Sequence, residues 1–166
     1  MGKKLTYILI LFCLVACSSG DSCMQDLNFS MKAEIYRMVF DNSTEQFVTE
    51  KYPISVTMSG LERDSLIYDS YSTSTLSFPL KKLDSISSFL FTTELKVDTG
   101  SIICIDTIDV HHINTEEFIS LECGCIVKNS IVGIAHTTNR IDSIVVVSPE
   151  VNLQSTNNIK IYLNQK

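Results

Sequence analysis

Cysteine and histidine are the residues of this chain whose side chains could hold a metal, act as nucleophiles or form disulfides. The chain has six cysteines and three histidines in 166 residues. His111 and His112 are adjacent, so in a strand they point to opposite faces and cannot easily serve one ion. Structural zinc sites usually show paired ligands at short spacing, and only Cys123-Gly124-Cys125 comes near this pattern. We therefore expect no metal site and no cofactor.

The sequence also lacks the motifs of nucleophilic catalysis. It has no Gly-x-Ser-x-Gly elbow, no His-Glu-x-x-His and no phosphate-binding glycine loop, and only six glycines in all. Cys125 and His136 would form a Cys–His pair only if the fold placed them together, and nothing in the sequence does so. We expect no catalytic residue and no enzyme activity.

The first 16 residues have the composition of an export leader. Lys3 and Lys4 precede an apolar run of eleven residues, 5–15, which is shorter than the roughly 20 residues that a membrane span needs. The run ends in Leu14-Val15-Ala16-Cys17, which resembles the lipobox of bacterial lipoproteins. The resemblance implies cleavage before Cys17 and lipid on Cys17, whose several acyl chains make the anchor permanent.

Two alternatives compete for this leader. Residues 1–6 also fit the myristoylation pattern, but the apolar run behind them argues for export. An uncleaved anchor helix would need further apolar residues after Cys17, and residues 18–22 are small or polar. We expect a signal peptide over residues 1–16, a lipidated tether over 17–27 and one domain over 28–166.

The mature chain is acidic. Removing Lys3 and Lys4 from 13 basic residues leaves 11 against 19 acidic ones, a formal charge of −8. Nucleic-acid binding depends on the neutralisation of phosphates, so the charge argues against it. The partners that we expect are the membrane, through the lipid on Cys17, and an envelope protein.

Apolar residues alternate with polar ones along most of the mature chain, which is typical of half-buried strands. Leu80, Leu83, Ile86 and Leu90 fall at helical spacing, but the serines among residues 85–88 form helix poorly, so we expect a loop leading into a strand. Many short strands without alternating helices predict an all-β fold, an antiparallel β-sandwich that is immunoglobulin-like or related, with about seven to nine strands. The expected strands lie near 29–40, 53–59, 64–69, 73–79, 87–97, 101–112, 116–128, 141–148 and 158–164.

Four cysteines remain for disulfides in an oxidising compartment, which allows three connectivities. If residues 101–112 and 116–128 form a hairpin around Asn114-Thr115, facing residues have numbers that sum to 229. Cys104 then faces Cys125 within an almost wholly apolar face, at a separation that a disulfide can bridge. The register therefore predicts Cys104–Cys125. It also pairs His112 with Glu117 on the surface.

The same register leaves Cys123 and Cys23 as the second pair. Cys123 lies two residues from Cys125, and an extended pair at that spacing is near the upper limit for bridging itself. A Cys23–Cys123 bond would close a loop of about 100 residues, worth up to ~4.7 kcal/mol in the chain-entropy model. Asp106 falls on the apolar face of this register, and the sequence offers no physical account of it.

A triplet of Asp, a hydroxyl residue and an aliphatic residue recurs four times, beginning at residues 64, 84, 106 and 142. It resembles the periplasmic O-glycosylation signal of Bacteroides-type bacteria. An Asp-Ser turn before a strand gives the same triplet through folding alone. We expect a glycan on Ser65 or Ser85, and no glycan on Thr107, which lies within a strand.

Short motifs spread over nearly the whole mature chain carry a family resemblance. They are Asp21-Ser22-Cys23, Asp64-Ser65-Leu66-Ile67-Tyr68, Phe118-Ile119-Ser120-Leu121-Glu122-Cys123-Gly124, Ile141-Asp142-Ser143-Ile144-Val145-Val146-Val147, Val151-Asn152 and Asn158-Ile159-Lys160-Ile161-Tyr162. The arrangement resembles a family of Bacteroidota lipoproteins known as domain-of-unknown-function family 6452. The resemblance implies that Cys23 and Cys123 are the shared disulfide. Cys125 stands where an aromatic residue is common in the family, which fits an added bridge to Cys104.

We therefore expect an envelope lipoprotein that is a non-catalytic binding or assembly module on the outer membrane. The alternative is a structural accessory subunit of a surface fibre or envelope complex, joined by strand addition at an open sheet edge. Ser18 is not the aspartate that retains lipoproteins in the inner membrane, and the acidic run associated with surface export is limited to Asp21. These residues favour a periplasm-facing position.

Overall fold

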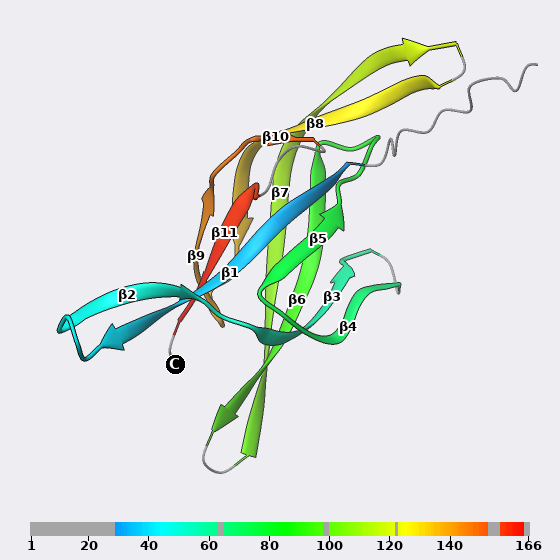
Figure 1. Ribbon diagram of the computed structural model, residues 1–166. Helices are drawn as coiled ribbons and strands as arrows, with labels where there is room; N and C mark the ends of the chain where they lie inside the picture. Colours follow the sequence, from blue (N-terminus) through cyan, green and yellow to red (C-terminus); the bar gives the residue numbers. More distant parts are fainter. Residues whose placement is uncertain (1–28, 63–64, 98–99, 122, 153–156, 165–166) are drawn as a thin grey trace, which may run out of the picture.

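A computed structural model describes residues 29–62, 65–97, 100–121, 123–152 and 157–164 of the chain. Within these residues the chain forms eleven strands and no helix, arranged as two packed sheets that do not close into a barrel (Figure 1). No helix in this part of the chain is long and apolar enough to cross a membrane. The predicted all-β sandwich is confirmed, with two more strands than the upper expected number.

The five-stranded sheet is built around β1. Its strands, in spatial order, are β2 (Gln46–Lys51), β1 (Ser30–Asp41), β11 (Ile159–Leu163) and β9 (Ile141–Val146), and β5 (Thr75–Pro79) also pairs with β1. β5 pairs with residues 30–34 of β1 and β2 with residues 36–41, so these two strands follow one another along the same edge. β1 and β11 are parallel, and the other pairs in this sheet are antiparallel.

The six-stranded sheet is antiparallel throughout. Its order is β10 (Glu150–Val151), β8 (Gly124–His136), β7 (Gly100–Ser120), β6 (Ile86–Val97), β3 (Ile54–Gly60) and β4 (Leu66–Thr73). The five-stranded sheet therefore ends in β9 on one side and in β2 and β5 on the other. The six-stranded sheet ends in β4 and β10.

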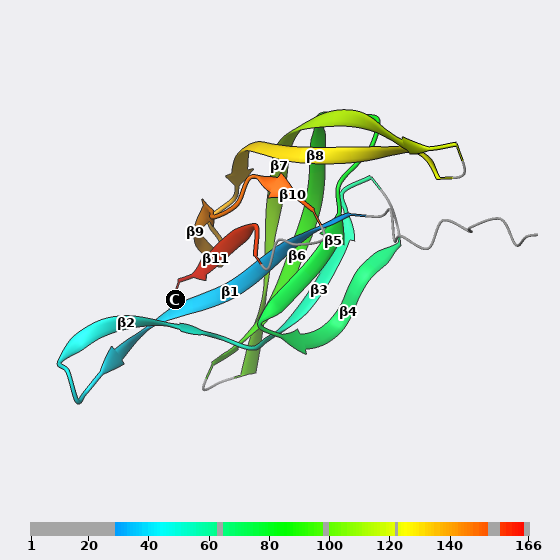
Figure 2. The same ribbon diagram turned by 45° about the horizontal axis from the view of Figure 1, so that its top comes forward.

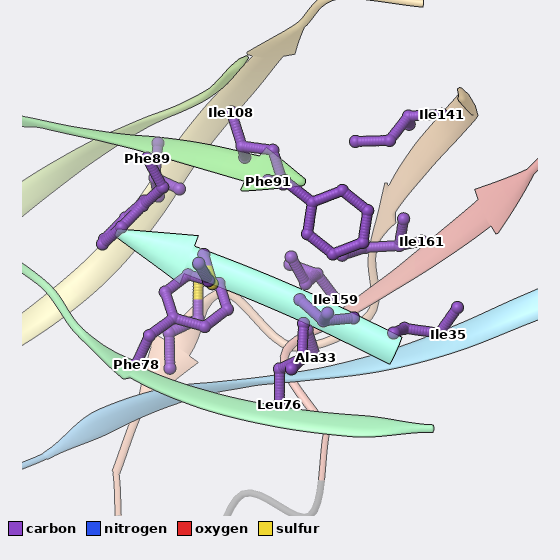
Figure 3. Packing of buried hydrophobic residues seen from close by; sticks show 14 of the residues in the cluster. Ala33, Ile35, Leu76, Phe78, Phe89, Phe91, Ile108, Ile141, Ile159 and Ile161 are labelled. Carbon is purple, nitrogen blue, oxygen red and sulfur yellow. The ribbon is translucent and has the colours of Figure 1, made fainter. Parts of the chain in front are cut away.

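The core lies between the sheets and is made by alternate residues of each strand. Met31, Ala33 and Ile35 of β1 are buried while their neighbours are half-buried, as a one-sided strand requires (Figure 3). Phe78 of β5 and Phe89 of β6 meet edge to face across the two sheets, with ring centroids 4.8 Å apart. These contacts join strands that are far apart in sequence into one core.

Three hairpins extend beyond the sandwich. In Figures 1 and 2 the β7–β8 hairpin projects at the end where β1 begins, and the β1–β2 hairpin projects at the opposite end. The paired end of β6 and start of β7 form a third projection. All three turns carry exposed apolar side chains close by, including Phe118, Phe47 and Val97.

The expected hairpin around Asn114-Thr115 is wrong. β7 continues without a break to Ser120, and the chain turns just before Gly124, whose φ of 70° suits glycine. Facing residues near the turn have numbers that sum to 243, as for Phe118 and Cys125. Between the turn and His112 the shift from 229 to 243 is even and leaves the pairing of faces unchanged, so the match of apolar faces could not separate the two registers there. Beyond a bulge between His111 and His112 the sum is 244.

The predicted Cys104–Cys125 disulfide is also wrong, because both cysteines are free thiols. Cys104 lies opposite Thr93 of β6, and Cys125 lies opposite Phe118 near the hairpin turn. Cys123 is disulfide-bonded, and neither of the other two described cysteines is its partner. The predicted partner, Cys23, lies outside the described residues, as does Cys17, so the Cys23–Cys123 pairing stays a prediction.

The predicted surface pair of His112 and Glu117 is not formed either. His112 faces Ile131 and is buried, whereas Glu117 forms an ion pair with Lys128 across the hairpin. The inward face was nevertheless correctly predicted in the middle of β7, since Ile108, Val110 and the unexplained Asp106 are all buried, whereas Ile102 on the same predicted face is exposed. The expected loop over residues 80–85 is confirmed, with β6 beginning at Ile86.

Candidate functional site

A groove of about 530 Å³ opens between β4, at the end of one sheet, and β5 and β1 of the other. It combines aromatic rings with hydroxyl groups and charged side chains. The lining residues are Lys32, Ala33, Glu34, Tyr68, Tyr71, Thr73, Thr75, Leu76 and Ser77. Because strands from both sheets contribute, the groove exists only in the folded sandwich.

A bulge in β4 brings two tyrosines to this groove. Val56 and Met58 of β3 lie opposite Tyr71 and Tyr68, so three steps along β4 match two along β3. Residues three apart in a regular strand point to opposite faces, whereas the bulge places Tyr68 and Tyr71 on the same one. The extra residue is accommodated at Ser70, whose φ is 48°. That conformation is unfavourable for a residue with a Cβ and often marks a functional position.

The two tyrosines have different surroundings. The Tyr68 hydroxyl accepts the backbone N–H of Ser77 at 2.7 Å and donates to the Ser77 carbonyl at 3.1 Å. Tyr68 thereby links β4 to β5 across the open edge. The Tyr71 residue is 58% exposed, and its ring lies 6.0 Å from that of Tyr68 with a tilt of 31°. Tyr68 is thus held in place, while Tyr71 presents an aromatic surface to solvent.

Glu34 carries the negative charge of the groove, and its carboxylate accepts three hydrogen bonds. Its carboxylate accepts hydrogen bonds from Lys51 Nζ at 2.5 Å, the Tyr36 hydroxyl at 2.8 Å and Asn157 Nδ2 at 2.9 Å. The bond from Lys51 is the main reason that the pKa of Glu34 is lowered, and the bond to Glu34 in turn raises the pKa of Tyr36. The groove therefore has little uncompensated charge at this position.

A second hollow, of about 560 Å³, lies beside the 79–84 loop and is lined by Leu61, Ile67 and Phe89 among others. One of its lining residues, Ser87, belongs to a serine–histidine–asparagine arrangement. Ser87 Oγ lies 2.8 Å from His112 Nε2, and His112 Nδ1 lies 2.7 Å from Asn114 Oδ1. These two hydrogen bonds link the three residues as a nucleophile, its base and the group that orients the base are linked in a catalytic triad.

Hydrogen-bond accounting shows which ring nitrogen of His112 donates to Asn114. The two N–H groups of Asn114 Nδ2 are shared among three backbone carbonyls, those of Lys81, Lys82 and Asp84, so Asn114 Oδ1 is the acceptor. His112 Nδ1 must then donate to Asn114 Oδ1, and His112 Nε2 shares the second hydrogen bond with the hydroxyl of Ser87.

The surroundings of Ser87 favour a structural role for this network. Ser87 is 1% exposed, and its Oγ already accepts the backbone N–H of Lys81 at 2.8 Å. Asn129 donates to the same Asn114 oxygen at 2.7 Å. Every partner outside the strands belongs to the loop after β5, so the network holds that loop against the six-stranded sheet.

The remaining predicted sites are dispersed. Ser65 and Ser85 are both exposed, Ser65 just before β4 and Ser85 just before β6, and their glycosylation stays a prediction. His136 lies at the end of β8 with its ring bonded to the Thr137 carbonyl, far along the strand from Cys125. Among the residues that the structure describes, no three His, Cys, Asp or Glu side chains are grouped as metal ligands.

The sequence alone did not identify the tyrosine groove. Tyr68 stands in one of the motifs quoted above, but Tyr71 follows it at a spacing that puts the two on opposite faces of a regular strand. Only the bulge at Ser70 reverses this, and no glycine or proline marks it in the sequence. The network of Ser87, His112 and Asn114 was also missed, because Asn114 was interpreted as a turn residue.

Comparison with known proteins gives one family and no closer relative. Residues 55–163, which include β3 to β11, match the group described as "Family of unknown function (DUF6452)". No curated protein and no solved structure matches the chain significantly. The match covers more than half of the chain and includes both Tyr68 and Tyr71 of the groove. The chain belongs to the DUF6452 family.

Proposed function

We propose that this chain is a lipid-anchored, non-catalytic binding module of the bacterial cell envelope, and that the tyrosine groove holds its ligand. The observation that carries the proposal is the bulge at Ser70, which places Tyr68 and Tyr71 side by side at the open edge between the sheets. A strained residue that redirects an aromatic ring into a groove is better explained by binding than by packing, because Tyr71 remains largely exposed.

The ligand class that fits the groove is an uncharged oligosaccharide. The C–H face of a sugar ring packs on an exposed aromatic ring such as that of Tyr71, while its hydroxyls need donors and acceptors at the rim. Thr75 and Ser77 supply hydroxyls there, and Thr73 Oγ1 is oriented by bonds to the backbone of Thr75. The carboxylate of Glu34 is paired with Lys51, which favours an uncharged ligand over a cationic one.

The lipid anchor and the location of the protein rest on its leader. Cleavage before Cys17 and acylation of Cys17 would place the domain in the envelope of a Bacteroidota cell, on the outer membrane. Surface export is associated with a run of acidic residues just after the lipidated cysteine. Here that run is limited to Asp21, which favours the periplasmic side. Protease treatment of intact cells tests the side, because a periplasmic domain stays protected until the outer membrane is opened.

A non-catalytic role is supported by the hydrogen bonds of Ser87, which is the chain's best candidate for a nucleophile. Ser87 is 1% exposed although it borders the second hollow, and its Oγ already accepts the backbone N–H of Lys81, which supports a structural role for this hydroxyl.

Calorimetric titration of the purified protein with a panel of soluble gluco-, xylo-, manno- and chito-oligosaccharides tests the proposal. We expect one of these classes to bind, and we expect Tyr71→Ala to weaken that binding at least about tenfold, equal to about 1.4 kcal/mol. Phe47→Ala is the matched control, since Phe47 is an exposed aromatic residue outside the groove. Binding to none of the panel, or equal losses in the two variants, would contradict the proposal.

A second candidate function, assembly by strand addition, is favoured by β9. β9 lies at the end of its sheet, and Val145, Val146 and Val147 are exposed without a lysine or proline among them. The Val147 N–H donates to the Asn158 carbonyl, so odd-numbered residues at this end of β9 direct their backbone N–H and C=O groups toward β11. The even-numbered ones, such as Ile144, direct their backbone groups to the open edge.

Affinity purification from native envelopes separates the two candidates. A partner that is joined through β9 should be lost in Val145→Lys, which adds the kind of charge that guards natural sheet edges. The same partner should be retained by Tyr71→Ala. The opposite result would assign the partner to the groove.

A further inference from the structure

The tip of the β7–β8 hairpin is an exposed apolar surface. Phe118 is 61% exposed, Leu121 is 91% exposed, and Ile119 beside them is also exposed. Both Figure 1 and Figure 2 show this hairpin projecting beyond the sandwich, at the same end as the start of β1. Exposed apolar groups at the end of a projection stand clear of the rest of the surface and can reach a partner first.

The tip carries a disulfide-bonded cysteine, Cys123. Cys123 is disulfide-bonded, whereas Cys104 and Cys125 are free. The other three cysteines of the chain, at positions 13, 17 and 23, all precede β1. The predicted bond from Cys123 to Cys23 would join the hairpin to the same stretch of chain that carries the predicted lipid.

The length of that stretch limits how far the tip can lie from the membrane. If Cys23 is the partner, residues 18–22 separate the lipidated Cys17 from the disulfide, and the distance from Cys17 to Cys23 is at most about 20 Å when the chain is fully extended. Leu121 is two residues from Cys123, so it stays within reach of the headgroup region of the bilayer.

The charges behind the tip limit how deeply it can enter. Glu116 and Glu117 precede Phe118, with Glu116 about 7 Å back along the strand, and Glu117 is paired with Lys128. Carboxylates are costly in the hydrocarbon region but are tolerated among headgroups. Glu122 directly follows Leu121 in the sequence, so the tip is suited to contact at the depth of the headgroups, with Phe118, Ile119 and Leu121 as its apolar groups.

We propose that the β7–β8 tip docks into the interfacial layer of the bilayer that holds the lipid on Cys17, and so fixes the orientation of the domain. This inference rests on the lipid anchor of the proposed function. It makes Phe118, Ile119 and Leu121 a second, non-covalent membrane contact beside the acyl chains. The tyrosine groove and the β1–β2 hairpin are not part of this contact.

Tryptophan fluorescence tests the proposal, because the natural chain contains no tryptophan. Phe118→Trp and, separately, Leu121→Trp place one reporter on the tip. Phe47→Trp places one on the β1–β2 hairpin, which projects at the opposite end and is also exposed. Each lipidated protein is reconstituted into phosphatidylcholine vesicles with and without lipid brominated near the headgroup end of the chain. Intact mass establishes the lipid on Cys17 in each sample.

The expected result is loss of most emission in brominated vesicles for Phe118→Trp and Leu121→Trp, with emission shifted to shorter wavelength, and no change for Phe47→Trp. If the protein carries lipid and neither tip variant is quenched, the docking is overturned while the anchor stands. Equal quenching of all three variants overturns the docking as well, because the contact would not be specific to the tip. If Cys17 carries no lipid, the anchor and the docking fail together.

Discussion

The buried carboxylate of Asp106 accepts the backbone N–H of Arg140 at 2.8 Å, which joins the middle of β7 to the loop between β8 and β9. The same carboxylate accepts the N–H of Asn139 at 2.7 Å, the N–H of Ile141 at 3.1 Å and the Thr137 hydroxyl at 2.8 Å. That loop carries the chain from one sheet to the other, so Asp106 fixes the crossing. A buried carboxylate is costly unless its oxygens accept hydrogen bonds, and Asp106 accepts four.

Replacing Asp106 should be strongly destabilising. In Asp106→Ala the loop N–H groups lose their acceptor and remain buried, so we expect a loss of about 3 kcal/mol or more in the free energy of unfolding. Asp109→Ala, on the opposite face of the same strand, is the control and should cost much less. Urea unfolding followed by circular dichroism measures both. Equal losses would contradict the anchoring role of Asp106.

The free and bonded cysteines should behave differently near one hairpin turn. Cys123→Ser removes the disulfide and should lower stability by up to ~4.7 kcal/mol if the closed loop has about 100 residues. Cys125→Ser removes an exposed free thiol two residues away and should leave stability nearly unchanged. Peptide mapping without reduction identifies the partner of Cys123. A Cys123–Cys125 peptide would contradict the structure, and a partner other than Cys23 would contradict the predicted pairing.

The carboxylate of Glu34 should make stability depend on pH. Its pKa is lowered below the ordinary value of 4.5, chiefly by the bond from Lys51. A lowered folded-state pKa contributes stability that is present above pH 4.5 and is lost as the pH falls through the folded pKa. Glu34→Gln should therefore cost roughly 1 kcal/mol at neutral pH, and the difference should shrink in acid. Urea unfolding across this range measures it, with Glu45→Gln in the exposed turn as the control. A difference that does not change with pH would contradict the assignment.

The network around His112 should stabilise the loop without supplying a nucleophile. Asn114→Ala removes the acceptor of His112 Nδ1 and the donor to three carbonyls, so we expect a loss of about 2 kcal/mol. A fluorophosphonate probe should not label the protein, because Ser87 Oγ is buried. Labelling that disappears in Ser87→Ala would show an accessible, activated serine and would contradict the proposed non-catalytic role.

Alternation of apolar and polar residues was sufficient to predict the sandwich, because each face of a strand repeats every second residue. It placed Ile108 and Val110 in the core correctly. The same alternation could not fix the partner of a strand, since registers that differ by an even number of residues bury the same side chains. The Asn114-Thr115 pair was a plausible turn signal, and the glycine that actually allows the turn, Gly124, stands near its end.

The candidate site was less predictable than the fold. The groove depends on a bulge at Ser70, a serine in a conformation that its residue type does not favour. It also depends on Ser77 from the other sheet, which holds the Tyr68 hydroxyl. Contacts between residues of different sheets have no periodic signal in the sequence. The strand β2 was missed because all of its residues are exposed, so no buried face marks it.

Acylation of Cys17 is the central claim, because the location, the predicted disulfide pairing and the membrane docking all depend on it. Labelling with radioactive palmitate in a bacterial host, with Cys17→Ala as the control, tests it most directly. We expect label in the membrane-bound natural protein and none in the variant. A natural protein that incorporates no label, keeps Met1 and is recovered in the cytosol would contradict the account.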